Sequence, residues 1–263
     1  MRPIQRFSNF DFLRRQNNIM KEPRLRTVEK YHPPFPLNEL PSNFALSLGR
    51  EVIYHLATRT APILEGTDWE QIFARLIGAR WKPSNVGLDD VVLEQTAWGA
   101  KTVKNDNPAT ASRVRLISGR NSLFYSFGDR EVSEFDPADV GQKVLSIWNE
   151  RVAAIRKHYK HLRTVVLVKS DDLLELSVFE FDTNMFPDGD FVWTWNKRNN
   201  LEGNNKKTGE HKFTWQPHGS QFTIVESIPA DRLAIRIKQP PMLNQDEILH
   251  ALRFDASWIE IIK

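Results

Sequence analysis

The chain has 263 residues, of which 40% are hydrophobic and 26% are charged, so it can bury a sizeable core beneath a well-solvated surface. It contains no cysteine, which excludes disulfides, thiolate zinc sites and cysteine nucleophiles, and leaves oxygen or imidazole ligands for any metal. No stretch approaches the roughly 18 apolar residues of a membrane-spanning helix, and the N-terminus lacks the apolar centre of a signal peptide. We therefore expect a globular cytoplasmic protein that does not act on a membrane.

Positive charge is clustered along the chain. The formal net charge is only +3, but the pI is near 9.1 and basic residues concentrate in 113–120, 156–163 and 197–212. Such clusters attract phosphate groups, as in nucleic-acid-binding proteins. A basic cluster is also compatible with a merely solvated face.

The first half of the chain predicts an arm, two helices and a hairpin. Residues 1–43 are rich in Arg, Asn and Pro, which favours an irregular arm. Apolar residues at helical spacing predict a helix from Asn43 to the Ala61-Pro62 pair. Thr67, with Glu70 three residues on, resembles a capping box that opens a second helix. The pattern of residues 89–104 predicts a β-hairpin.

The second half predicts one long helix followed by strands. Asp136-Pro137 opens the helix, residues 164–170 and 173–182 are neighbouring strands, and residues 191–239 are β-rich. Residues 246–254 form a short helix. The order of these elements predicts a mixed α/β (α+β) fold in which helices flank a central sheet. We expect one domain, with the catalytic core in 44–180 and a β-rich part that contacts DNA in 181–263.

Asp90 and Lys101 carry the candidate chemistry. Asp90 starts the first strand of the predicted hairpin and Lys101 lies in the second, so the hairpin can bring them together. Hydrolysis of a phosphodiester needs a divalent cation held by carboxylates and a water made nucleophilic near neutral pH. A lysine can orient or deprotonate that water. Glu70, in the preceding helix, offers a second carboxylate that binds the metal or assists the water.

Three alternatives stay open at this point. Asp89 competes with Asp90, because side chains alternate along a strand and only one of the two can point inward; we prefer Asp90 because it adjoins Val91-Val92. Lys101 is either catalytic or an exposed strand residue. Glu70 serves either the helix cap or the metal.

Residues 69–104 resemble the PD-(D/E)XK nuclease superfamily, to which most type II restriction endonucleases belong. In that family, a helix bearing a Glu precedes a hairpin whose Asp faces a (D/E)-X-Lys tripeptide. The resemblance implies a restriction-endonuclease-like fold with a Mg²⁺ ion at Asp90 and Glu70. This sequence departs from the pattern twice: Leu88-Asp89-Asp90 replaces Pro-Asp, and Gly99-Ala100-Lys101 replaces (D/E)-X-Lys. Glu70 is the first candidate for the displaced acid, followed by Glu94 and Glu150.

Two segments carry side chains suited to DNA. After the hairpin come Arg113, Arg115, Arg120 and Asn121, residue types that make bidentate contacts to guanine or adenine edges. Phosphate contacts are an equal alternative for Arg113 and Arg115. Residues 193–222 suggest a long polar hairpin whose amides are mostly not needed for folding. The residues there that we expect to contact DNA are Lys197, Arg198, Asn199, Lys206 and Lys207.

These features together predict a Mg²⁺-dependent type II restriction endonuclease that cleaves double-stranded DNA. A homodimer is expected, because two identical sites related by a two-fold axis match a palindromic target. Neither a G-x-x-x-x-G-K loop nor a G-x-G-x-x-G fingerprint is present, so no nucleotide cofactor is expected. The alternatives are a DNA-binding protein that retains a nuclease-like scaffold without catalysis, and a structure-specific repair or resolvase nuclease.

Overall fold

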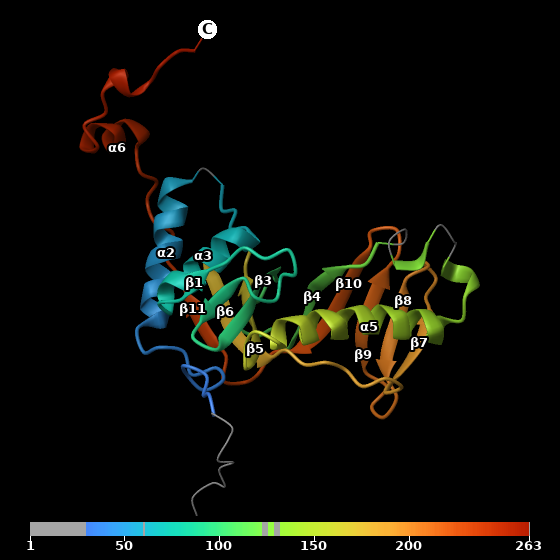
Figure 1. Ribbon diagram of the computed structural model, residues 1–263. Coiled ribbons are helices and arrows are strands. Elements are labelled where there is room, and N and C mark those ends of the chain that lie inside the picture. The colour runs from blue at the N-terminus through green and yellow to red at the C-terminus, as the bar shows by residue number, and fades with distance from the viewer. Residues whose placement is uncertain (1–29, 60, 123–125, 129–131, 263) are drawn as a thin grey trace, which may run out of the picture. The chain divides into compact units, whose positions relative to one another are not determined.

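The computed structural model describes residues 30–59, 61–122, 126–128 and 132–262 (Figure 1). The chain divides into two compact units, residues 1–31 and 32–263. The arm predicted for residues 1–43 lies largely outside the described residues, and its described part, 30–43, contains turns but no helix or strand. Within the described residues, the second unit is mixed α+β, with four α-helices and two β-sheets.

Most of the predicted elements are present. The helices are α2 (Phe44–Thr58), α3 (Gly66–Leu76), α5 (Pro137–Arg156) and α6 (Gln245–Ala251). The first sheet contains β1 (Arg80–Trp81), β2 (Val91–Leu93), β3 (Thr96–Lys104), β5 (His161–Lys169), β6 (Glu175–Asp182) and β11 (Leu233–Arg236). The second contains β4 (Arg113–Arg120), β7 (Phe191–Trp195), β8 (Leu201–Asn205), β9 (His211–Gln216) and β10 (Gln221–Ser227). None of the described helices has both the length and the apolar character needed to cross a membrane.

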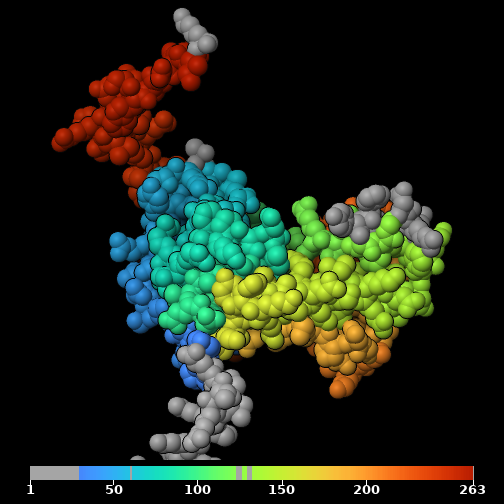
Figure 2. Space-filling model, in the orientation of Figure 1, coloured from blue at the N-terminus to red at the C-terminus, as the bar shows by residue number. Residues whose placement is uncertain are grey.

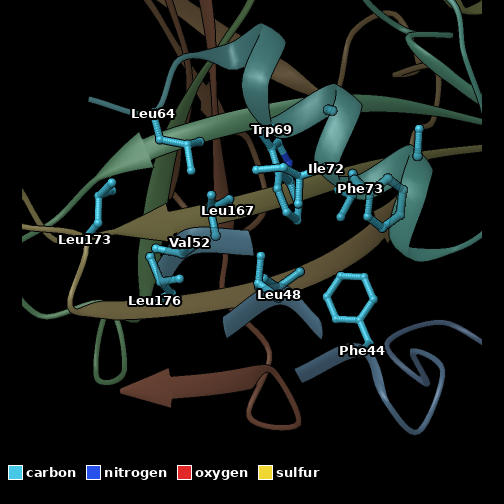
Figure 3. Packing of buried hydrophobic residues seen from close by; sticks show 14 of the residues in the cluster. Phe44, Leu48, Val52, Leu64, Trp69, Ile72, Phe73, Leu167, Leu173 and Leu176 are labelled. Atoms are coloured by element: carbon cyan, nitrogen blue, oxygen red, sulfur yellow. The ribbon is translucent and has the colours of Figure 1, made fainter. Parts of the chain in front are cut away.

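The first sheet is mixed and runs in the order β1-β2-β3-β5-β6-β11. Strands β3 and β5 are parallel, whereas the other neighbours are antiparallel. Strand β5 is buried along nearly its whole length, as its continuous apolar run predicts. Helices α2 and α3 supply Leu48, Val52, Trp69 and Phe73 to a core shared with Leu167 of β5 (Figure 3).

The second sheet is antiparallel and runs in the order β4-β10-β9-β8-β7. Helix α5 packs closely on it, because Gly141 leaves no side chain in the way: an added Cβ would lie 2.1 Å from Cδ2 of Trp193. Trp193 stacks on Phe213 of β9, with 5.6 Å between the ring centroids. The apolar residues of α5 and of this sheet therefore form a second core.

The two sheets do not follow the division expected at residue 180. Strand β4 precedes that residue but belongs to the second sheet, whereas β11 follows it and pairs with β6 in the first. Val114 and Leu116 of β4 also pack against Val166 and Val168 of β5. The catalytic and β-rich parts expected from the sequence are thus interleaved along the chain.

The irregular residues after 31 are anchored on the first sheet. Phe35 stacks on Trp98 with 5.8 Å between the ring centroids, and its carbonyl accepts a hydrogen bond from Arg163 Nη1 at 3.0 Å. Asn38 Oδ1 accepts a hydrogen bond from the backbone N–H of Glu180 at 2.6 Å. Arg163 and Glu180 form a buried ion pair, 3.4 Å apart, beneath this segment.

The start of α3 differs from the prediction. Thr67 is not its N-cap: the helix is capped by Glu65, whose side chain and that of Asp68 form the capping box. The side chain of Asp68 accepts a hydrogen bond from the backbone N–H of Glu65 at 2.9 Å. Glu70 is consequently one turn inside the helix and has no capping role. The predicted start of α5 is confirmed, since the side chain of Asp136 accepts a hydrogen bond from the N–H of Ala138 at 2.8 Å.

Candidate active site

The hairpin predicted for residues 89–104 is present and sets the geometry of the site. Val91 pairs with Trp98 and Val92 with Ala97, so Asp90, immediately before β2, lies beside Gly99. Because side chains alternate along a strand, Asp90 shares a face of the sheet with Val92, and Lys101 shares that face with Ala97 and Gly99. The backbone therefore directs Asp90 and Lys101 to the same side of the sheet.

The two charged groups are neighbours in the folded chain. Lys101 Nζ lies 3.8 Å from Asp90 Oδ2. The same carboxylate oxygen accepts a hydrogen bond from the backbone N–H of Ala100 at 3.1 Å, and Lys101 Nζ donates to the carbonyl of Gly87 at 2.9 Å. Asp90 is 3% exposed, whereas 22% of the Lys101 side chain is accessible. Backbone groups thus hold both side chains, and part of the Lys101 side chain remains accessible.

Burial shifts the protonation of both groups. It raises the pKa of Asp90 to about 6, with a further increase from the charge of Glu70 and a partly compensating decrease from Lys101. Burial lowers the pKa of Lys101, while the charges of Asp90 and Glu70 raise it. Both charged forms are therefore less stable here than in water, which is typical of functional sites and also occurs in structural ion pairs.

The neighbouring Asp89 faces a different partner. It is also 3% exposed, but its Oδ2 accepts a hydrogen bond from Lys82 Nζ at 2.5 Å. This hydrogen bond is the largest cause of the raised pKa of Lys82. Alternation along the strand thus separates the two carboxylates, and Asp90 is the one beside Lys101.

Glu70 lies near this pair without touching it. Its Oε2 accepts a hydrogen bond from Trp81 Nε1 at 3.0 Å, at the edge strand β1. Its charge nevertheless raises the pKa of both Asp90 and Lys101. The other candidate acids are exposed: Glu94 occupies the β2–β3 turn with a φ of 52°, and Glu150 lies on α5. Of these three, Glu70 is the one whose charge acts on Asp90.

The structure explains why position 99 has no acid. A Cβ added to Gly99 would lie 2.9 Å from the carbonyl oxygen of Gly87 and 3.2 Å from Cα of Leu88. The loop before β2 therefore occupies the space that a side chain would need. Gly87 itself has a φ of +66°, a conformation that suits glycine. Its carbonyl, held over β3, is the group that receives the Lys101 hydrogen bond.

Arg151 belongs to the site but was not anticipated. It reaches from α5 and donates to the carbonyl of Ser118 at 2.6 Å and to the carbonyl of Val86. Its charge also lowers the pKa of Lys101. A signal was present in the sequence, because Arg151 stands between Trp148 and Ile155 on the apolar stripe of the helix. Charged residues on such a stripe usually have a specific partner.

A cavity of about 320 Å³ adjoins Lys101. Its walls come from both sheets and from α5, including Thr164, Trp148 and Ile224. The ion pair between Lys212 Nζ and Glu226 Oε1, 2.7 Å apart, lines it as well. Lys101 is thus one of the residues that line a space between the two sheets.

The DNA-contacting residues predicted within 113–121, on β4 and just after it, lie in different environments. Arg113 is exposed but forms an ion pair with Glu210 at 2.6 Å, and Arg115 donates to Thr214 Oγ1 at 3.3 Å. Arg120 is exposed. Asn121 is only 3% exposed, so the expectation that it contacts DNA does not fit its position. Its side-chain N–H₂ group has no partner among the described residues.

The expected long polar hairpin at residues 193–222 is wrong. These residues form parts of four successive strands joined by short turns. The expectation that folding needs few of their amides also fails. Asn196 Oδ1 accepts hydrogen bonds from two backbone N–H groups of the β7–β8 turn, and Asn205 Oδ1 does the same in the β8–β9 turn. Asn199 adopts a φ of 53°, which asparagine tolerates better than most residues.

The remaining residues predicted to contact DNA lie at opposite ends of the second sheet. Lys197, Arg198 and Asn199 are in the β7–β8 turn, at the end where Arg120 pairs with Gln221. Lys206 and Lys207 are in the β8–β9 turn, at the end where Arg113 pairs with Ser227. The predicted set is therefore not one continuous surface, but two groups separated by the length of the strands.

Comparisons with protein-family models, with curated proteins and with solved structures find no match.

Proposed function

We propose that this chain is a Mg²⁺-dependent endonuclease of the type II restriction kind, which hydrolyses phosphodiester bonds in double-stranded DNA. The observation that carries the proposal is the Asp90–Lys101 pair, whose charged groups lie 3.8 Å apart at the β2–β3 hairpin and are fixed by backbone hydrogen bonds. The sequence order of a Glu-bearing helix followed by this hairpin supports a restriction-endonuclease-like fold. Asp90 and Lys101 are the proposed catalytic residues, and Glu70 is the proposed assisting acid.

The donor set suits magnesium. Among the described residues, no three His, Asp or Glu side chains gather around one point. Mg²⁺ does not need such a cage, since it keeps several waters and is held by one or two carboxylates. Asp90 and Glu70 supply hard oxygen atoms, and their mutual repulsion raises the pKa of Asp90. We propose that these two would hold the ion, which when bound would stabilise the charge developing on the phosphate.

Lys101 has the freedom to act on a water or on the phosphate. An ammonium has three N–H donors, of which one is used on the carbonyl of Gly87. The exposed part of the side chain borders the cavity between the sheets. In the proposed mechanism, Lys101 orients the attacking water and offsets the negative charge of the transition state.

Gly87 is proposed as a positioning residue. Its carbonyl occupies the space beside Gly99 and fixes Nζ of Lys101. In the (D/E)-X-Lys motif an acid stands at the position of Gly99. Here the Gly87 carbonyl would orient the lysine in place of that acid, while Glu70 would supply its negative charge.

The exposed basic groups are proposed DNA contacts. Arg120, Lys197 and Arg198 lie at one end of the second sheet, and Lys206 and Lys207 lie at the other. Cations at such positions would bind phosphates and add affinity without sequence preference. The partner we propose is duplex DNA, bound by a homodimer.

The test is cleavage of mixed-sequence plasmid DNA with and without Mg²⁺. Wild type should give discrete fragments only with Mg²⁺, and Lys101→Ala should cut at least about 100-fold more slowly, the usual range for loss of a group that stabilises transition-state charge. Lys104→Ala is the matched control, because Lys104 lies on the same strand but pairs with exposed Asp171. Undiminished cutting by Lys101→Ala would overturn the assignment. Salt-sensitive binding without cleavage would indicate the non-catalytic alternative, and cutting only at branched DNA would indicate a structure-specific nuclease.

A further inference from the structure

The C-terminal residues after 243 form a segment that buries none of its side chains against the rest of the described chain. Helix α6 has only two turns and no buried residue (Figure 1). Beyond it, Trp258 is 62% exposed and Ile262 is 90% exposed. Figures 1 and 2 draw this segment in red. A helix this short is not stable by itself in water, and exposed large apolar side chains in a continuous run mark a contact site.

Helix α2 has a second apolar face that is also uncovered. Its inner face, with Leu48 and Val52, is buried in the first core (Figure 3). On its outer face, Leu46, Ile53 and Tyr54 follow one another at helical spacing and are 71%, 41% and 67% exposed. We call this outer face, together with Gly49 and Arg50, the α2 stripe.

Gly49 leaves the α2 stripe without a side chain at one position, so another chain could approach the helix backbone closely there. A glycine inside an exposed helix costs about 1 kcal/mol relative to alanine. Nothing lies within 4 Å of the Cβ that an added side chain would have. Among the described residues, no crowding therefore requires this glycine. A second chain passing closely over the helix would favour it.

The C-terminal segment and the α2 stripe are complementary in charge. Residues 244–262 contain four acidic residues, Asp246, Glu247, Asp255 and Glu260, against one Arg, which gives a formal net charge of −3. The α2 stripe carries Arg50 in its centre, and that residue is exposed. Apolar contacts flanked by opposite charges are the usual composition of a specific interface.

The geometry of attachment favours a second copy of this chain as the occupant. The segment starts immediately after Leu243, whose N–H donates to the carbonyl of Ala57 near the end of α2 at 2.9 Å. It follows Pro240-Pro241, a pair that stiffens the backbone. Within one chain the segment leaves both itself and the α2 stripe exposed. Because every copy carries both surfaces, two copies can cover all four reciprocally and close a two-fold dimer.

We propose that residues 244–262 of one copy pack on the α2 stripe of a second copy, and reciprocally, to form a homodimer. The partner is thus a second copy of this chain, joined by exchanged C-terminal segments. This dimer follows from packing, exposure and charge alone, and does not require the chain to be a nuclease.

The absence of cysteine allows a direct test on the full-length protein. Ile53→Cys and Ile259→Cys are made as separate variants, mixed, treated with a short bismaleimide and analysed on denaturing gels. Light scattering gives the mass of the untreated wild type. We expect a dimer in solution and cross-linked pairs that contain one copy of each variant. Ile117→Cys, at an exposed position of β4, is the control for random collision and should cross-link far less with Ile259→Cys.

Three results would overturn the proposal. The first is a wild type that is monomeric at all concentrations tested. The second is a double variant, Ile53→Cys with Ile259→Cys, that cross-links only within single chains, which would mean that the segment folds back on its own helix. The third is Ile53→Cys cross-linking to itself more than to Ile259→Cys, which would mean that the two α2 helices face each other.

Discussion

Replacing Asp90 with asparagine should make the protein more stable at neutral pH. The pKa of this carboxyl is raised from 3.8 to about 6 by burial. As pH rises between about 4 and 6, the unfolded chain ionises while the folded chain stays protonated, so the free energy of unfolding decreases and reaches its lower level above about pH 6. A difference of about two pH units corresponds to about 3 kcal/mol. Asparagine keeps the shape and can accept the Ala100 hydrogen bond, but it does not ionise.

The measurement is urea unfolding in EDTA, followed by tryptophan fluorescence at about pH 4.5 and about pH 7.5. Asp90→Asn should gain up to about 3 kcal/mol over wild type at the higher pH and much less at the lower. Added Mg²⁺ should stabilise wild type and leave Asp90→Asn nearly unchanged, because a ligand that binds only the folded state stabilises it. Asp89→Asn is the control: it is equally buried but loses the negative charge that pairs with Lys82, so no gain is expected. A variant less stable than wild type at pH 7.5 would refute the reasoning.

Two further substitutions test how the site is built. Gly99→Ala should cost about 1–3 kcal/mol and slow cleavage, because its Cβ would press on the Gly87 carbonyl that holds Lys101; thermal unfolding measures the loss, and Gly66→Ala, with open space around it, should be close to neutral. An unchanged melting temperature for Gly99→Ala would show that the loop before β2 yields easily. Arg151→Met should cost about 1–3 kcal/mol in a urea titration, since it leaves two carbonyl groups without their donor. Equal stability of this variant would mean that water replaces the guanidinium.

The hairpin and its charged pair could be predicted because their signals are local. A β-branched run, a polar break and a second extended run fix a hairpin, and alternation then decides which of Asp89 and Asp90 shares the face of Lys101. The start of α3 was predicted wrongly because its sequence contains two overlapping capping patterns. Thr67 with Glu70 fits the preferred residue types, yet the structure uses Glu65 with Asp68. Propensity alone does not distinguish the two.

Long-range contacts account for what the sequence did not reveal. The clash that excludes a side chain at Gly99 involves a loop twelve residues earlier, and the role of Arg151 depends on carbonyls from two other elements. The polar tract after residue 193 was misinterpreted for the opposite reason. Its asparagines accept hydrogen bonds within nearby turns, which is a common use of this residue.

The interleaving of the two sheets has a consequence for how the protein folds. Strand β4 is made early, but its partner β10 begins only at Gln221, about a hundred residues later, and the first sheet lacks its last strand until Arg236. Contacts between such distant residues are slow to form, because a long loop must close before they contribute. The cavity beside Lys101 takes its walls from both sheets. During synthesis, both members of the charged pair would therefore emerge long before the strands that enclose that cavity.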